Sequence, residues 1–352
     1  MRDRWTRAAR AASVGLVCST RPSQSSEPRG QTGDPVLARI GAAALRWAAA
    51  SPWTNVYGLA RSLLALGTAL TLATTPTSVL FTATTGRPVG PNCVGPAGFG
   101  LFCVVPIDRL ELVRLVAVVL LAVAASGWRP RLTAIPHWWV SFSVATSASV
   151  IDGGDHVTQV LTLLMLPVAL TDSRRWHWEA DGATGSATTR LIALSALTAI
   201  RIQVAGIYAQ AAIAKLAVPE WVDGTVMYYW LTDPTYGAPG WLQPIVMPLI
   251  TTGFVAVISW SVLALEFALA FALVATKRIW PYLLAVGVLF HVFIAVFLGL
   301  VTFGLAMSAA LIVYLRPAQE AFALPRRLVE AHRAIYEARA SASGAAAAPA
   351  RR

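Results

Sequence analysis

Residues 282–307, YLLAVGVLFHVFIAVFLGLVTFGLAM, contain no Asp, Glu, Lys or Arg and a single histidine, His291. About 20 consecutive apolar residues are enough for a helix to cross a membrane, and comparable stretches recur along the chain. The 352-residue sequence is 56% hydrophobic and only 13% charged, whereas a soluble domain carries about 25% charged residues. We therefore expect an all-α, polytopic transmembrane bundle, a multi-pass protein of the cell membrane, and not a soluble enzyme.

Eight apolar segments are predicted to span the membrane. Their approximate bounds are 56–74, 110–127, 137–150, 156–171, 190–216, 244–275, 280–297 and 299–316. The third segment is short and the last two have almost no loop between them, so the number of spans is about eight. The segments form a transmembrane domain, residues 51–316, between a partly disordered basic tail at 1–50 and a second basic tail at 317–352. Residues 35–52, which include the end of the first tail, are predicted to form either an amphipathic helix on the inner membrane surface or a solvated helix.

The distribution of basic residues predicts the orientation, because short cytoplasmic loops are rich in Arg and Lys. With the first tail inside, the inner loops and the start of the second tail hold Arg129, Arg131, Arg174, Arg175, Arg190, Lys277, Arg278, Arg316, Arg326 and Arg327. The outer loops hold only Arg87 and Arg109. Both termini are therefore expected in the cytoplasm. The net charge of +11 is explained by this topology signal, and no nucleic-acid partner is expected.

Two of the three cysteines share one predicted outer loop. Cys93 and Cys103 lie in GRPVGPNCVGPAGFGLFCVVP, residues 86–106, and Cys18 lies in the first tail. Because disulfides persist in oxidising compartments, we expect Cys93 and Cys103 to form one bond. The alternative is a pair of buried free thiols.

Several ionisable residues fall within or at the ends of the apolar segments, where an unpaired charge is costly and such a group is a candidate for function, and we single out seven of them. They are Arg61, Arg114, His156, Arg201, Lys215, Glu266 and His291. No spacing of ligands within a helix indicates a metal site.

The fifth segment places Arg201, Tyr208 and Lys215 at intervals of seven residues, nearly two helical turns, so all three lie on one stripe. We expect the stripe to face the bundle interior. The alternative is that Arg201 and Lys215 extend their charges to opposite membrane surfaces. Of 28 basic residues only Lys215 and Lys277 are lysines. Because burial favours the neutral form of lysine while arginine stays protonated, Lys215 is the best candidate for a base.

The other polar residues have both a functional and a structural interpretation. Asp155 could orient His156, or Asp155 could only cap the helix that begins there. His291 could act at a site, although a lone histidine in an apolar helix usually makes a structural hydrogen bond. An ionised Glu266 requires a cation, which Arg61, Arg201 or Lys215 could supply.

Three stretches together resemble the bacterial sporulation-delaying protein B family. They are WTNVYGLARSLLALGTALTLATTPTSVLF (53–81), SASVIDGGDHVTQVLTLLMLP (147–167) and YAQAAIAKLAVPEWVDGTVMYYWLTDP (208–234). The resemblance extends over about residues 50–316. It implies a multi-pass protein that assists maturation of a secreted antimicrobial peptide toxin outside the membrane, with the peptide precursor, a small partner protein and membrane lipid as partners.

The same segments are more distantly similar to the HTTM superfamily, which includes the vitamin K-dependent gamma-carboxylase. Lys215, Trp221 and Gly224 resemble its motif around a basic lysine, with one extra residue in the spacing. The remaining matches are His156, Glu266 and the Phe290–His291 pair with Phe303 and Met307 downstream. The sequence ends shortly after the eighth segment and does not include the carboxylase's large lumenal domain, so protein carboxylation is not expected to carry over.

Three functions follow as hypotheses. The first is maturation of a peptide toxin, and the second is an HTTM-type enzyme that acts on a quinone or lipid, with Lys215 as base and His156 or His291 orienting it. The third is a transporter or immunity-like scaffold with only structural polar residues. The sequence has no GxSxG or HExxH motif, and it leaves open whether the chain is an enzyme and which cofactor it would use.

Overall fold

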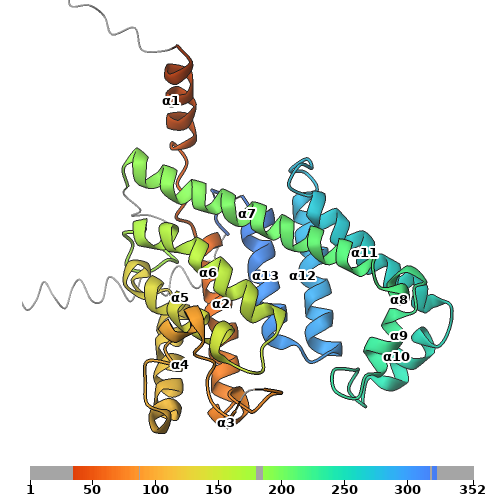
Figure 1. Ribbon diagram of the computed structural model, residues 1–352. Helices are drawn as coiled ribbons and strands as arrows, with labels where there is room; N and C mark the ends of the chain where they lie inside the picture. The colour runs from red at the N-terminus through yellow and green to blue at the C-terminus, as the bar shows by residue number, and fades with distance from the viewer. Residues whose placement is uncertain (1–34, 87, 180–184, 318, 323–352) are drawn as a thin grey trace, which may run out of the picture. The chain divides into compact units, whose positions relative to one another are not determined.

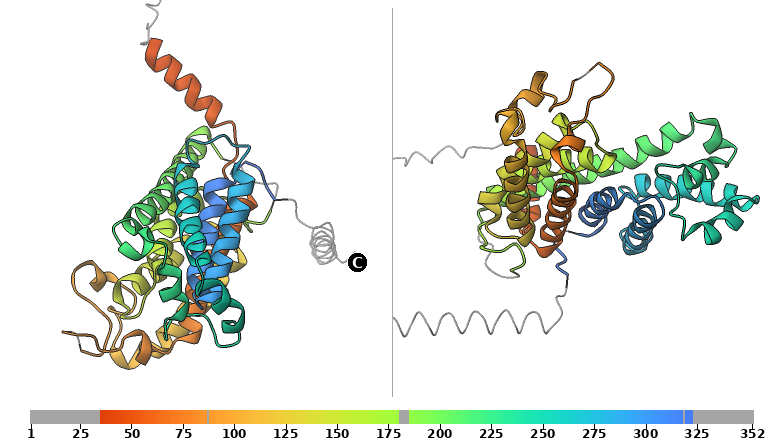
Figure 2. Two further views of the ribbon diagram at one scale, coloured as in Figure 1. Left: turned by 90° about the vertical axis from the view of Figure 1, so that its right-hand side faces the viewer. Right: turned by 90° about the horizontal axis from the view of Figure 1, so that it is seen from below.

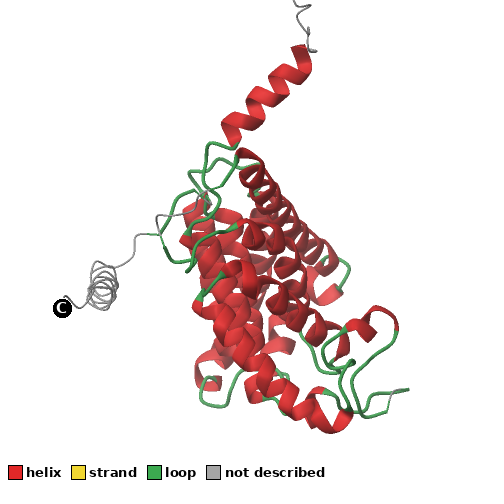
Figure 3. Cartoon of the chain, turned by 90° about the vertical axis from the view of Figure 1, so that its left-hand side faces the viewer, coloured by secondary structure: helices red, strands yellow, loops and turns green. Residues whose placement is uncertain are grey.

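The computed structural model describes residues 35–86, 88–179, 185–317 and 319–322. Throughout these ranges the regular elements are helices (Figure 1, Figure 3), and the β-structure consists of isolated bridge residues, such as the pair Trp128 and Trp176. The all-α prediction is therefore confirmed. The two predicted tails lie mostly outside the described residues, except for helix α1 (Pro35–Trp47) of the first tail, whose contact with a membrane stays a prediction.

Four of the described helices are long and apolar enough to cross a membrane: α2 (Asn55–Thr74), α7 (Ala187–Lys215), α11 (Phe254–Phe271) and α12 (Trp280–Phe297). Four further helices match predicted segments but are shorter or less apolar: α4 (Leu110–Ser126), α5 (Pro130–Ser147), α6 (Gly153–Thr171) and α13 (Val301–Leu315). The chain is thus a helical membrane protein, and its number of spans stays a prediction.

The predicted sixth segment, residues 244–275, is two helices and not one. Helix α10 (Gln243–Ile250) ends before Thr251, and α11 begins at Phe254. Pro248 lies inside α10, and the sequence Thr-Thr-Gly at 251–253 follows the end of α10. Because proline removes a helical hydrogen bond and glycine is a poor helix former, these residues explain the break that hydrophobicity alone did not reveal.

Helix α13 lies at the centre of the largest core. It packs against α2, α12, α6 and α7, and α12 and α13 lie side by side as the two blue helices in Figure 2. Small residues allow this close approach: a Cβ added at Gly304 would lie 3.0 Å from the carbonyl oxygen of His291. Buried residues of α2, including Tyr57 and Leu64, complete this core.

Short elements shape the predicted outer end of the bundle. They are α3 (Thr77–Leu80), the 3-10 helices η1 (Gly95–Phe99) and η2 (Ile107–Arg109), α8 (Pro219–Val222) and α9 (Val226–Thr232). Cys93 and Cys103 form a disulfide with their Cα atoms 5.6 Å apart. The disulfide expected from the sequence is therefore confirmed.

Candidate functional site

Lys215 and Glu266 form an ion pair between α7 and α11. The Lys215 Nζ atom lies 2.8 Å from Glu266 Oε1, and the two side chains are 23% and 7% exposed. Of the three cations proposed for Glu266, the structure therefore selects Lys215. The second carboxylate oxygen, Oε2, is buried and has no hydrogen-bond partner, although a buried polar atom normally has one.

A residue of the turn after α7 also contacts the ammonium group of Lys215. Trp221 of α8 places its ring 5.2 Å from Lys215 Nζ, a distance at which a cation is attracted to the aromatic face. Gly224 follows with a φ of +82°, and a Cβ at this position would lie 2.7 Å from Ala256 Cβ of α11. Glycine is thus required both by the backbone conformation and by the close approach of this turn to α11.

Tyr208 and His291 form a second buried pair close to the first. The Tyr208 hydroxyl lies 2.8 Å from His291 Nε2, and Phe290 and Phe303 contact the imidazole with ring centroids 5.0 and 5.6 Å away. His291 Nδ1 is buried without a hydrogen-bond partner. Helices α7, α11 and α12 therefore bring four predicted residues, Tyr208, Lys215, Glu266 and His291, to one region of the bundle. We call them the lysine cluster.

Arg201 does not belong to the lysine cluster. Its guanidinium donates hydrogen bonds to the carbonyl oxygens of Val313 and Arg316, and it lies 5.2 Å from the Trp280 ring. Fourteen residues separate it from Lys215 on α7, which is about 21 Å along a helix axis. The stripe predicted from the sequence therefore serves two separate sites.

The first turn of α6 also lies outside the cluster. Asp152 and Asp155 form a reciprocal capping box, so the structural interpretation of Asp155 describes its contacts. His156 is exposed, and its side chain makes no hydrogen bond to the rest of the described chain. An indirect connection to the cluster exists. Asp152 accepts a hydrogen bond from the Thr302 hydroxyl. The residue after Thr302 is Phe303, whose ring contacts His291.

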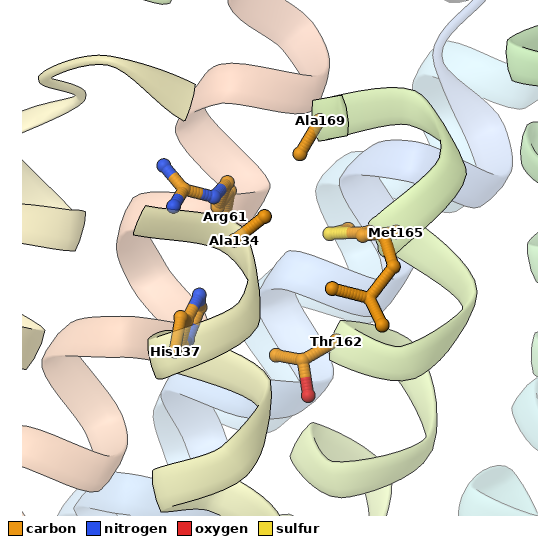
Figure 4. Close-up of a pocket in the computed structure, with 7 residues that line it drawn as sticks. Arg61, Ala134, His137, Thr162, Met165 and Ala169 are labelled. Carbon is orange, nitrogen blue, oxygen red and sulfur yellow. The ribbon is translucent and has the colours of Figure 1, made fainter. Parts of the chain in front are cut away.

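Arg61 lies in a different polar region, between α2, α4 and α5. Its guanidinium donates to Thr133 Oγ1 at 2.7 Å and to the carbonyl oxygen of Ala124 at 3.2 Å. Figure 4 shows a small pocket beside it, in which the imidazole of His137 turns toward Arg61. The pocket, roughly the size of one water molecule, is also lined by Ala134, Thr162, Met165, Leu166 and Ala169.

A buried ion pair that was not predicted from the sequence lies next to this region. Asp172 Oδ2 lies 2.8 Å from a guanidinium nitrogen of Arg174, with neither side chain exposed to solvent, and it accepts a hydrogen bond from the Tyr57 hydroxyl. The sequence Asp-Ser-Arg-Arg at 172–175 contains a possible signal, an acidic residue two positions from an arginine at a helix end. The prediction from the sequence gives these arginines only a role in topology.

His177 belongs to the same buried region and was also not predicted. It lies 3.2 Å from Ser62 Oγ, and its backbone N–H donates to the carbonyl oxygen of Gly127. Its burial, together with the charges of Arg61 and Arg174, holds the pKa of the imidazole well below its usual range. The loop after α6 is therefore anchored by a neutral histidine.

No group of three or more His, Cys, Asp or Glu side chains within the described ranges has an arrangement that could hold a metal ion. The lysine cluster consists instead of two pairs, Lys215–Glu266 and Tyr208–His291, each linked by one hydrogen bond. In the lysine cluster the chemical groups are an ammonium, a carboxylate, a phenol and an imidazole, all of which exchange protons.

Comparison with known proteins assigns the family. The model of the HTTM domain matches residues 65–318. The chain belongs to the HTTM family. It is 38% identical to the sporulation-delaying protein SdpB of Bacillus subtilis over 271 residues, which are 77% of this chain and 84% of SdpB.

A second relative in Bacillus subtilis, the uncharacterized protein YitO, is 40% identical over 275 residues, or 77% of this chain and 88% of YitO. No solved structure matches the chain. Within the HTTM family the chain therefore belongs with SdpB and YitO. It is a multi-pass protein of the bacterial cell membrane.

Proposed function

We propose that this membrane protein assists maturation of a secreted antimicrobial peptide on the outer side of the membrane, as its similarity to SdpB suggests. Its partners in this process are the peptide precursor and a small partner protein. The observation that supports a chemical role for the chain is the Lys215–Glu266 pair, in which a half-buried lysine contacts a buried glutamate that retains an unpartnered carboxylate oxygen.

The pair gives Lys215 a route to act as a base. Transfer of one proton from Nζ to the carboxylate converts the ammonium and the carboxylate into a neutral amine and a carboxylic acid, and apolar surroundings favour the neutral forms. The amine then has a free lone pair that accepts a proton from a substrate. Glu266 thus holds the proton of Lys215, and Trp221 fixes the position of Nζ.

The alternative function is an HTTM-type enzyme that acts on a quinone or lipid. The observation in its favour is the turn after Lys215, in which the Trp221 ring lies 5.2 Å from Lys215 Nζ and Gly224 lies close to Ala256 of α11. His291 would then orient the substrate or the base. His156 stays a candidate for the same role on sequence grounds alone.

Replacement of Lys215 tests the proposed function. Lys215→Arg keeps the positive charge and the ion pair but cannot supply a neutral amine at working pH. We expect Lys215→Arg to be as defective as Lys215→Ala, with a loss of about 100-fold or more. The measurement is secreted toxin activity restored to a Bacillus subtilis strain that lacks SdpB, with membrane abundance determined by immunoblot.

Lys277→Arg is the matched control, because Lys277 is the second of only two lysines and lies outside the lysine cluster. We expect it to restore full activity. Full activity of Lys215→Arg would reject the base and leave only a structural charge, and failure of the unmodified chain to restore any activity would reject the maturation function in that host.

A further inference from the structure

The loop that contains the disulfide folds back along α5. The backbone N–H of Asn92 donates to the carbonyl oxygen of Ser147, the last residue of α5. Leu101 N–H donates to Ser143 Oγ at 2.7 Å. Because Ser143 lies one helical turn, about 6 Å, before Ser147, the loop descends beside the helix and does not project beyond its end.

A third contact extends the descent. The indole N–H of Trp139, two turns before Ser147, donates to the carbonyl oxygen of Phe99 at 2.9 Å. The fit against α5 is close, since a Cβ added at Gly100 would lie 3.1 Å from Ser147 Oγ. The Cys93–Cys103 disulfide closes the loop across this region. The loop is therefore fixed along the last two turns of a predicted membrane helix.

Despite these constraints, the loop exposes large apolar side chains. Five of them are 60–82% exposed: Val89, Val94, Phe99, Val104 and Ile107. Residues 88–107 contain no charged side chain. Four of the twenty positions are proline, which has no backbone N–H and so reduces the number of donors that require a partner.

We propose that residues 88–107, which we call the apolar loop, are inserted into the surface of one membrane leaflet. This is the leaflet at which α2 ends and α4 begins, and it is predicted to be the outer one. Lipid is the occupant that fits. A descent of one to two helical turns is close to the depth of 5–10 Å at which interfacial segments bury their apolar side chains. The exposed apolar face of α4, including Leu112, Leu115 and Val119, follows directly in the chain.

The charge pattern marks where the insertion ends. Asp108 and Arg109, immediately after the apolar loop, form an exposed ion pair with side chains 72% and 65% exposed. Charged groups at this position stay in water at the membrane surface, while the apolar side chains before them contact lipid. The proposal goes beyond the proposed function because none of these residues belongs to the lysine cluster.

Site-directed spin labelling of the full chain tests this placement. The chain carries Cys18→Ser, keeps the Cys93–Cys103 disulfide, and is reconstituted into vesicles of phosphatidylethanolamine and phosphatidylglycerol. Nitroxides are attached at Phe99→Cys, at Leu115→Cys as the lipid-facing control, and at Asp108→Cys as the control in water. Collision rates with lipid-soluble oxygen and with a water-soluble nickel chelate are measured at each position.

We expect the ratio of oxygen to nickel collisions at Phe99→Cys to match that at Leu115→Cys and to exceed that at Asp108→Cys several-fold. Val89→Cys should behave like Phe99→Cys. A ratio at Phe99→Cys equal to that at Asp108→Cys would overturn the proposal, because the loop would lie in water. Low collision rates with both reagents would also overturn it, because a second copy of the chain would then cover the loop.

Discussion

Asp172 is the most completely buried charge that the described chain pairs with an opposite one. Neither its side chain nor that of Arg174 is exposed, and Tyr57 donates a further hydrogen bond to it. Removing one partner of a buried ion pair is far more costly than the pair's net contribution, because the other charge stays buried without compensation.

Asp172→Asn should therefore lower the free energy of unfolding by about 3–5 kcal/mol. The change removes the negative charge but leaves the guanidinium of Arg174 in the interior. The measurement is the unfolding midpoint of the purified protein in detergent. Asp108→Asn, in the exposed pair with Arg109, is the control and should change little. An unchanged midpoint for Asp172→Asn would show that Arg174 finds another partner or reaches water.

A residue could be recognised from the sequence as a candidate site residue only where its type is unusual for the segment that contains it. Lys215 and Glu266 were identified because both are isolated in apolar sequence, and the structure pairs them. Asp172 and His177 lie in a polar loop, where such residues are ordinary, so only packing distinguishes them. No pattern in the sequence could tell that His156 is exposed while His291 is buried.

At the scale of elements, the contribution of the disulfide to the free energy of unfolding can be separated from that of packing. It closes a loop with a sequence separation of 10, and a loop of that size is stabilised by about 2–3 kcal/mol in the chain-entropy model. We expect the loop to keep its hydrogen bonds to α5 when the disulfide is absent, and therefore we expect reduced stability and not unfolding.

The double variant Cys93→Ser, Cys103→Ser should accordingly lower the free energy of unfolding by about 2–3 kcal/mol. Chemical denaturation in detergent measures the change, and Cys18→Ser is the control that should have no effect. The same loss should follow when the unmodified chain is reduced. If reduction and double substitution both leave the midpoint unchanged, the hydrogen bonds to α5 alone fix the loop.

Element positions were predicted well where hydrophobicity decides and poorly where local backbone chemistry does. The segments predicted at 56–74 and 280–297 correspond closely to α2 and α12. The segment at 244–275 is interrupted because Pro248 and Gly253 act within an apolar run. The path of the apolar loop along α5 depends on Ser143, Trp139 and Ser147, whose role as partners becomes visible only in three dimensions.

At the scale of the whole molecule, the two polar regions lie toward opposite ends of the predicted spans. The lysine cluster includes Lys215, the last residue of α7, and the Asp172 region follows the last residue of α6. With the predicted orientation, the lysine cluster is near the outer surface, where a secreted peptide would arrive, and the Asp172 region stabilises the cytoplasmic end. The proposed function therefore depends on the orientation.

Labelling of single cysteines in whole cells tests the orientation. In a Cys18→Ser background that keeps the disulfide, an impermeant thiol reagent should label Asp233→Cys, on the predicted outer side, and should not label Arg175→Cys. Both native residues are exposed, so a lack of labelling reports the compartment and not burial. After permeabilisation Arg175→Cys should label as well, which shows that its thiol is reactive.

The expected pattern follows from the arginines, because the inner loops hold most of the basic residues and the outer loops only Arg87 and Arg109. The opposite pattern, with Arg175→Cys labelled and Asp233→Cys protected in intact cells, would place the lysine cluster near the cytoplasm. A base near that surface would have no access to an exported precursor. The maturation proposal would then fail even if Lys215→Arg were inactive, and an enzyme acting on a substrate within the membrane would be favoured.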